Sequence, residues 1–201
     1  MLSLKHQSVY CRLKQKLLNL LGFCKRIDYI NYEITNYMTL VSSLKMNESD
    51  STTCNALYKC FSDIERIGDH AINIIQYSTD EDNKLSSSKY IEDELHQLAS
   101  LLSKSFSLLS TYSLDSQDEC FEKIERIEDR IDELTASYRQ AQIERLMEKK
   151  VNALDCVIYS EILTDVERVS DHIMNIIQEA KRCNFTLSDE AIQSDPALSA
   201  A

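Results

Sequence analysis

A fourteen-residue phrase occurs twice in this sequence, and both copies keep the same polar residues. The first copy, DIERIGDHAINIIQ, begins at Asp63, and the second, DVERVSDHIMNIIQ, begins 102 positions later at Asp165. Nine of the fourteen positions are identical, and most differences exchange one apolar residue for another. A helix that only packs in a core has to keep its apolar period, not its polar residues. The repetition therefore predicts a duplicated unit that carries a duplicated polar site.

The rest of the chain predicts an all-α fold. Only two Gly and one Pro occur in 201 residues, and apolar side chains recur at three- and four-residue spacing in both halves. The expected helices cover residues 2–21, 24–41, 52–77, 88–112, 116–147 and 153–182. They group into two tandem three-helix bundles related by internal duplication. The predicted division is a first bundle over 1–80, a second over 86–183 and a frayed tail over 184–201.

Charge and cysteine content narrow the range of functions. The net charge of −11 disfavours binding to nucleic acid, which would need a basic face, and suits cations or a basic protein partner. Seven Cys without CxxC pairing predict small apolar thiols in a reducing cytoplasm, not a disulfide framework or a zinc finger. No apolar run approaches the roughly 20 residues that span a bilayer.

On a helix, the residues of the repeated phrase separate into faces. The apolar stripe that we expect to pack in the bundle consists of Ile64, Ile67, Ala71, Ile74 and Ile75. A second arc of roughly 80° holds Glu65, Asp69, Asn73 and Gln76, matched in the second copy by Glu167, Asp171, Asn175 and Gln178. Carboxylates at i and i+4 repel each other, so a nearby Arg or a bound cation has to offset the repulsion. Oxygen ligands with an adjacent amide suit Mg²⁺, Mn²⁺, Ca²⁺ or iron.

The second helix of each unit offers further carboxylates. In the second unit Glu128 and Asp132 form another i, i+4 pair, whereas the first unit keeps only Asp28 and has Cys24 in the place of Glu128. We therefore expect the second site to be the fuller one. The residues expected to support the ligands from a second shell are Asn73, Asn175, Asp63, Asp165, His70 and His172.

Other interpretations of the phrase stay open. Carboxylates on an acidic helix are usually solvated, which would make the protein a metal-free helical adaptor. We expect His70 and His172 to bond a backbone carbonyl or a carboxylate instead of a metal. A carboxylate-bridged metalloenzyme is the least favoured alternative, because a ferritin-like site needs His three residues after Glu, and here His follows Glu by five. A phosphotransfer histidine is not supported, because both histidines are crowded by Asp and Glu.

The phrases ERIGDHAINI and ERVSDHIMNI, together with the bundle plan over about residues 20–182, resemble the PhoU family of phosphate-uptake regulators. The segments IDYINYEITNYMTLVSS and YRQAQIERLMEKKV further resemble the cytosolic PhoU-like domain of bacterial Na⁺/phosphate cotransporter-family proteins. The resemblance implies two tandem three-helix bundles whose E(D)xxxD motifs hold metal clusters on the surface. The metal ligands that it implies are Glu65, Asp69, Asp28, Glu167, Asp171, Glu128 and Asp132.

The resemblance also implies a function, which is non-enzymatic regulation of phosphate transport or phosphate signalling. The expected cofactors are metal ions such as iron, manganese, magnesium or zinc. The expected partner is a phosphate transporter or its membrane domain, with a sensor kinase as another candidate and a homodimer as the assembly. We expect a cytoplasmic protein that meets the membrane only through its partner.

Overall fold

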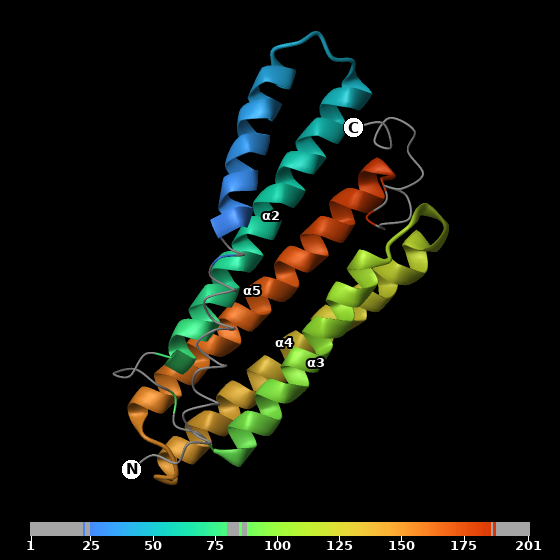
Figure 1. Ribbon diagram of the computed structural model, residues 1–201. Coiled ribbons are helices and arrows are strands. Elements are labelled where there is room, and N and C mark those ends of the chain that lie inside the picture. Colours follow the sequence, from blue (N-terminus) through green and yellow to red (C-terminus); the bar gives the residue numbers. More distant parts are fainter. Residues whose placement is uncertain (1–21, 23–24, 80–84, 86–87, 186, 188–201) are drawn as a thin grey trace, which may run out of the picture.

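The computed structural model describes residues 22, 25–79, 85, 88–185 and 187 (Figure 1). A first helix covers residues 25–42. The others are α2 (Glu48–Thr79), α3 (Lys89–Ser110), the 3₁₀ turn η1 (Leu114–Ser116), α4 (Gln117–Met147) and α5 (Ala153–Cys183). No strand occurs in these ranges, so the prediction of an all-α fold is confirmed. The helix predicted over 2–21 and Cys24 lie outside the described residues, as do most of the residues between the two predicted bundles and most of the predicted tail.

Capping residues explain where two of the long helices begin. α2 starts at Glu48, four residues before the predicted start, because Asn47 caps it: its Oδ1 accepts the backbone N–H of Asp50 at 2.8 Å. Asn152 caps α5 in the same way, accepting the backbone N–H of Asp155 at 2.8 Å. The other predicted boundaries agree with the structure to within two residues.

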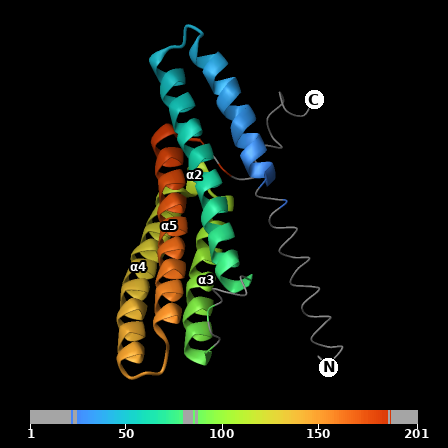
Figure 2. The same ribbon diagram turned by 90° about the vertical axis from the view of Figure 1, so that its left-hand side faces the viewer.

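The helix α5 lies at the centre of the molecule. The helix α2 packs along one side of it, and α3 and α4 pack along another (Figures 1 and 2). The helices α3, α4 and α5 form the three-helix bundle predicted for the second unit. In the first unit, the described part of the chain contributes two helices, residues 25–42 and α2.

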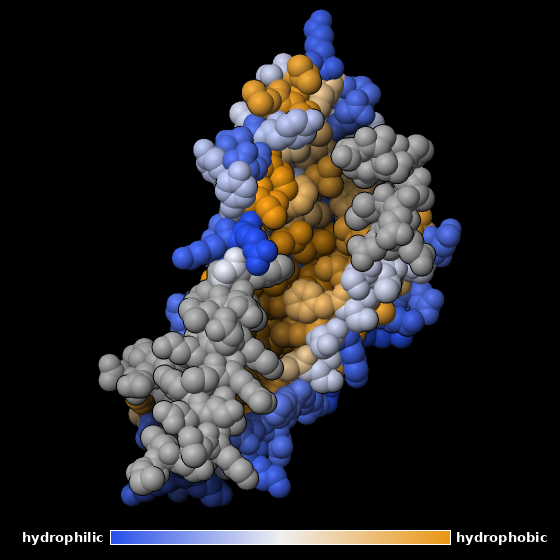
Figure 3. All heavy atoms as spheres, in the orientation of Figure 1, coloured by the Kyte–Doolittle hydropathy of each residue, from blue (hydrophilic) through white to orange (hydrophobic). Residues whose placement is uncertain are grey.

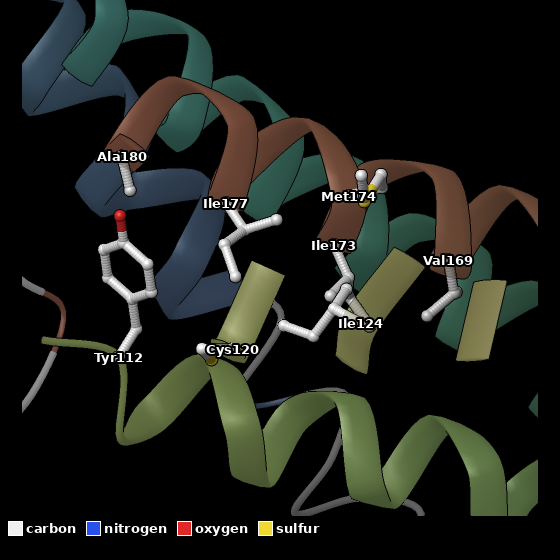
Figure 4. Close-up of a cluster of buried hydrophobic side chains, with 8 residues drawn as sticks. All are labelled: Tyr112, Cys120, Ile124, Val169, Ile173, Met174, Ile177 and Ala180. Carbon is white, nitrogen blue, oxygen red and sulfur yellow. The ribbon is translucent and has the colours of Figure 1, made fainter. Parts of the chain in front are cut away.

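Two buried clusters hold the second bundle together. One joins the end of α3 to α4 and α5 (Figure 4), and consists of Tyr112, Cys120, Ile124, Val169, Ile173, Met174, Ile177 and Ala180. The other lies nearer the α4–α5 turn, and consists of Ile91, Leu98, Ile131, Leu134, Tyr159, Leu163 and Val166. Burial of this apolar surface is the main force that holds the three helices together.

An ion pair closes the end of this bundle that lies near the α4–α5 turn. Arg145 on α4 binds both carboxylate oxygens of Glu94 on α3, one of them at 3.0 Å, and Tyr159 on α5 donates its hydroxyl to Glu94 at 2.6 Å. Burial first, and then the bond to Glu94, raises the pKa of Tyr159. One carboxylate therefore connects all three helices.

The first unit leaves more apolar surface uncovered. Six large apolar side chains on and just after the first helix are at least half exposed: Tyr29, Ile30, Tyr32, Tyr37, Leu40 and Leu44. Apolar side chains also gather in a hollow on the face seen in Figure 3. None of the described helices is long and apolar enough to cross a membrane.

Candidate functional site

The two copies of the repeated phrase lie against each other, one on α2 and one on α5. His70 Nδ1 in the first copy donates to Asp165 Oδ1 in the second at 2.7 Å. His172 Nδ1 in the second copy donates to Asp63 Oδ1 in the first at the same 2.7 Å. Because the residue number rises along one helix as it falls along the other, the helices are antiparallel and the contact has an approximate two-fold axis.

The remaining polar contacts follow the same symmetry. Asn73 Nδ2 lies 3.4 Å from Asp165 Oδ1, and Asn175 Nδ2 lies 3.4 Å from Asp63 Oδ1. The two imidazole rings stack near the axis, with centroids 5.6 Å apart and planes 25° apart. The Asp, the His and the Asn of the phrase are therefore self-complementary, since each copy supplies what the other needs.

This contact explains much of why the polar residues recur. The side chains of Asp63, Asp165 and His172 are between 10 and 14 % exposed, and that of His70 is 23 % exposed. A carboxylate so far removed from water is stable only with hydrogen-bond donors beside it. Each histidine was expected to bond a carboxylate or a backbone carbonyl, and the expectation is confirmed, since each bonds a carboxylate. Whether these six residues also support a metal stays a prediction.

One detail of the predicted faces was wrong. Ile64 was expected to pack in the bundle, but it is 38 % exposed. The interface between α2 and α5 is centred on the side of the helix that carries Asp63 and His70. Helix geometry places residues around the helix axis but does not say which face meets the partner helix.

In the second copy, the predicted ligand Glu167 has protein partners for both oxygens. Arg139 on α4 holds Oε1 at 2.7 Å and Oε2 at 2.6 Å, and Thr135 donates its hydroxyl to Oε1. Burial by itself would raise the pKa of Glu167, but the bonds from Arg139 and Thr135 outweigh burial and lower it. Glu167 is therefore a stable carboxylate in a two-pronged ion pair.

The other predicted ligands of this site lie close to one another. Burial first, and then the charge of Asp132, with Asp171 also contributing, raises the pKa of Glu128. Burial first, and then the charges of Glu167 and Asp171, raises the pKa of Asp132. Asp171 has one cation beside it, Arg168, at 3.3 Å. The four predicted carboxylates of the second site thus lie near enough to one another on α4 and α5 for their charges to repel.

The first site is less developed. Asp28 and Asp69 are exposed and Glu65 is partly exposed, and none of the three has an ion pair within the described residues. Among the described residues, none binds Glu65 in the way that Arg139 and Thr135 bind Glu167. Which of the two sites is the fuller in metal ligands stays a prediction.

The fit of a metal to these residues is partial. Carboxylate oxygens at Glu128, Asp132 and Asp171 have the charge and donor type that a hard cation needs. Both oxygens of Glu167 are already bonded to Arg139 and Thr135. Across the described ranges, no group of three or more His, Cys, Asp or Glu side chains is arranged so that it could hold a metal ion. The metal site therefore stays a prediction.

The sequence analysis missed Arg139 as a partner of Glu167. A signal was present, because Arg139 follows Asp132 by seven residues and so lies two turns further along the same face of α4. An Arg on the face of a carboxylate cluster offsets the repulsion of that cluster without a metal.

Comparison with known proteins gives consistent matches. A family model described as PhoU domain matches residues 24–78 and 95–180, one segment in each predicted unit. The chain is 28 % identical over 126 residues to the phosphate-specific transport system accessory protein PhoU homolog 1 of Thermotoga maritima, covering 61 % of this chain and 53 % of that protein. It is 24 % identical over 125 residues to the phosphate-specific transport system accessory protein PhoU homolog of Deinococcus radiodurans, covering 62 % of this chain and 58 % of that protein.

A solved structure has the same fold. The phosphate transport system regulatory protein PhoU from Streptococcus pneumoniae superposes with a TM-score of 0.64 at 20 % identity, covering 89 % of this chain and 83 % of that one. The sequence matches to the two curated relatives span little more than half of their length.

Proposed function

Because the chain belongs to the PhoU domain family, we propose that it regulates phosphate transport as a non-enzymatic helical module. The observation that carries this proposal is the match of the family model in two segments, one in each of the repeats that the sequence defines. The curated relatives are accessory proteins of phosphate-specific transport systems, which supports the same role here.

We propose a phosphate transporter or its membrane domain as the partner. The net charge of −11 supplies long-range attraction to a basic surface at the cytoplasmic side of such a transporter. A PhoU-like domain of a Na⁺/phosphate cotransporter-family protein would meet its membrane domain in this way. A sensor kinase as a second partner and a homodimeric assembly stay predictions.

We propose that a metal ion binds at the second carboxylate cluster, with Glu128, Asp132 and Asp171 as its ligands, and that these side chains move closer together to hold it, since they are not so arranged in this structure. Burial first, and neighbouring carboxylates second, raise the pKa values of Glu128 and Asp132, which supports this because a cation there would stabilise both carboxylates in their charged form. Glu167 would stay with Arg139 and orient the cluster from α5. The metal would supply positive charge at the surface, for an anionic group or for a contact with the partner.

A metal-free adaptor is the second candidate, and a specific observation favours it. Arg139 and Arg168 already place two cations beside the carboxylates of the second site, at Glu167 and Asp171. The two candidates differ in a measurable quantity, which is the metal content of the folded protein.

The test of regulation replaces the chromosomal gene with an Asp132→Asn/Asp171→Asn variant and measures phosphate uptake in high and in low phosphate. We expect uptake to lose its dependence on external phosphate. The matched control is Glu122→Gln/Glu133→Gln, which removes two charges from exposed ion pairs on α4 and should leave regulation intact. Normal regulation in a strain that lacks the gene altogether would contradict the regulatory role.

The test of metal binding is elemental analysis by plasma mass spectrometry on protein purified without a metal-affinity tag. We expect one or more equivalents of metal in the wild type and their loss in Asp132→Asn/Asp171→Asn. Metal-free wild-type protein, with a melting temperature indifferent to chelator, would favour the adaptor.

A further inference from the structure

A pocket of about 430 Å³ lies between α2 and α5, beside the contact of Asp63 with His172. Its volume is within the range of pockets that hold small molecules. Four of its lining residues lie on one stretch of α2, namely Tyr58, Lys59, Ser62 and Arg66. The side-chain amides of Asn175 and Gln178 line it from α5.

Both carboxylates that line this pocket already accept hydrogen bonds from protein donors. Asp63 accepts hydrogen bonds from His172 and Asn175, as described above. Glu179 accepts Lys59 at 2.8 Å and the guanidinium of Arg182, and these bonds outweigh the effect of burial and lower the pKa of Glu179. Glu179 is therefore compensated by two cations, and Asp63 is stabilised by hydrogen bonds.

Several donors in the pocket have no acceptor. Arg66 forms no ion pair or hydrogen bond within the part of the chain that the structure describes, and the hydroxyls of Ser62 and Tyr58 also have no partner there. Lys59 is 59 % exposed and uses one contact on Glu179, so it keeps further N–H donors. The pocket thus holds the guanidinium of Arg66, an ammonium at Lys59 that it shares with Glu179, and two hydroxyls.

Because the phrase is duplicated, each α2 residue of this pocket has an equivalent position 102 residues later in the chain. Lys59 corresponds to Glu161, which reverses the charge, and Arg66 corresponds to Arg168, which pairs with Asp171. The hydroxyl of Thr164, the counterpart of Ser62, donates to the Ser160 carbonyl at 3.0 Å and accepts Arg139 at 3.1 Å.

The electrostatics of the second position agree with this difference. Burial first, and then the charges of Asp165 and Glu161, raises the pKa of Tyr77, which stands there in the place of Glu179. The equivalent position in the second copy therefore has a negative environment and few free donors. Lys59 and a guanidinium without a carboxylate partner belong, among the described residues, to the first copy, so the need to pair α2 with α5 does not explain them.

We propose that the pocket at Lys59, Ser62 and Arg66 binds a phosphate group. A guanidinium presents two parallel N–H donors that match the oxygens of a phosphate, and the ammonium and hydroxyls can bond the remaining oxygens. The volume exceeds what a free ion fills, so the group can be inorganic phosphate or the phosphate of a monoester. The site is separate from the carboxylate cluster on α4, and binding there needs no metal and does not rest on the proposed regulatory role.

Isothermal titration of the full chain tests the proposal, at low ionic strength and with EDTA present throughout. Inorganic phosphate and phosphoserine are titrated in parallel, so that the two sources of the group are distinguished, and acetate serves as the anion control. We expect saturable binding of at least one phosphate ligand and none of acetate. Arg66→Gln should weaken the binding about tenfold or more, because a charge-assisted bidentate contact is lost.

The matched control is Arg168→Gln, the same substitution at the equivalent position of the second copy. It should leave the affinity unchanged, and Ser62→Ala should weaken the binding less than Arg66→Gln does. Arg66 and Arg168 are both exposed, so both variants should fold, which the melting temperature checks. The proposal is overturned by the absence of binding to both phosphate ligands, by equal loss in the two arginine variants, or by full affinity in Arg66→Gln.

Discussion

The two copies of the repeated phrase make the same contacts with each other and different contacts with everything else. The bonds from His to Asp are 2.7 Å in both directions, and those from Asn to Asp are 3.4 Å in both. In contrast, Glu167 is clamped by Arg139 and Thr135, whereas Glu65 has no ion pair among the described residues. The recurring polar residues therefore form two groups that the sequence alone does not separate.

The difference shows what a duplication keeps and what it changes. Asp, His and Asn are held by each other, so a change in one copy would remove a partner from the other copy. Three other positions contact neighbours that are not duplicated, such as Arg139 near the second copy. They are the Glu and the Arg of the phrase and the residue four positions before it. Those positions are free to acquire different roles, as Lys59 and Glu161 illustrate.

The largest expected effect comes from breaking the symmetric contact. Asp165→Ala and Asp63→Ala should each destabilise the fold by about 3 kcal/mol, because a mostly buried His and an Asn lose their acceptor. Urea unfolding measures the loss for both variants. Exposed Asp69→Ala is the control and should cost less than about 0.5 kcal/mol. A large loss of stability in only one of these two variants would show that the two copies are not equivalent.

A smaller effect should separate the two glutamates. Glu167→Gln should cost about 2 kcal/mol, because it weakens a bidentate ion pair, and Glu65→Gln should cost almost nothing. The pKa of Glu167 is lowered from its ordinary 4.5, so its contribution is present above that pH and is lost as the pH falls through the lowered value. Unfolding at pH 7 and pH 3 should therefore differ less in Glu167→Gln than in the wild type. Equal costs for the two glutamates would show that Arg139 contributes nothing.

The smallest effect concerns the repulsion in the second carboxylate cluster. Glu128→Gln should stabilise metal-free protein at pH 7 by a few tenths of a kcal/mol, roughly, since solvent screens a partly exposed group. The pKa of Glu128 is raised, so the wild type loses stability as the pH rises from 4.5 through the raised value. The gain from the variant should therefore vanish in acid. Thermal unfolding at pH 7 and pH 4 with EDTA measures it, and a loss of stability at pH 7 would mean that Glu128 makes a favourable contact.

Most of the fold could be predicted from the sequence. The helix over Ala153–Cys183 was predicted to within one residue at its end, because its apolar period is clear and a polar stretch precedes it. The same signals gave the type and order of every described α-helix, and missed the short 3₁₀ turn η1. Helix propensity and capping depend on residues only a few positions apart, so both can be recognised in the sequence.

The pairing of α2 with α5 could not be predicted in the same way. Asp63 and His172 are 109 positions apart, and their contact depends on which of several similar helices packs against which. The one available signal was that Asp and His recur together in both copies, which makes the phrase able to pair with itself. The clamp of Arg139 on Glu167 was missed for the same reason, since it joins two helices.

The self-complementary contact has a consequence for how such a chain can originate. An interface with a two-fold axis is the kind that two identical subunits form, with the same patch on both sides. Two separate chains of a single ancestral repeat would already contain the four bonds that now join α2 to α5. Fusion of two such genes would convert a homodimer into one polypeptide without a new contact, and each copy could then diverge at positions outside the shared patch.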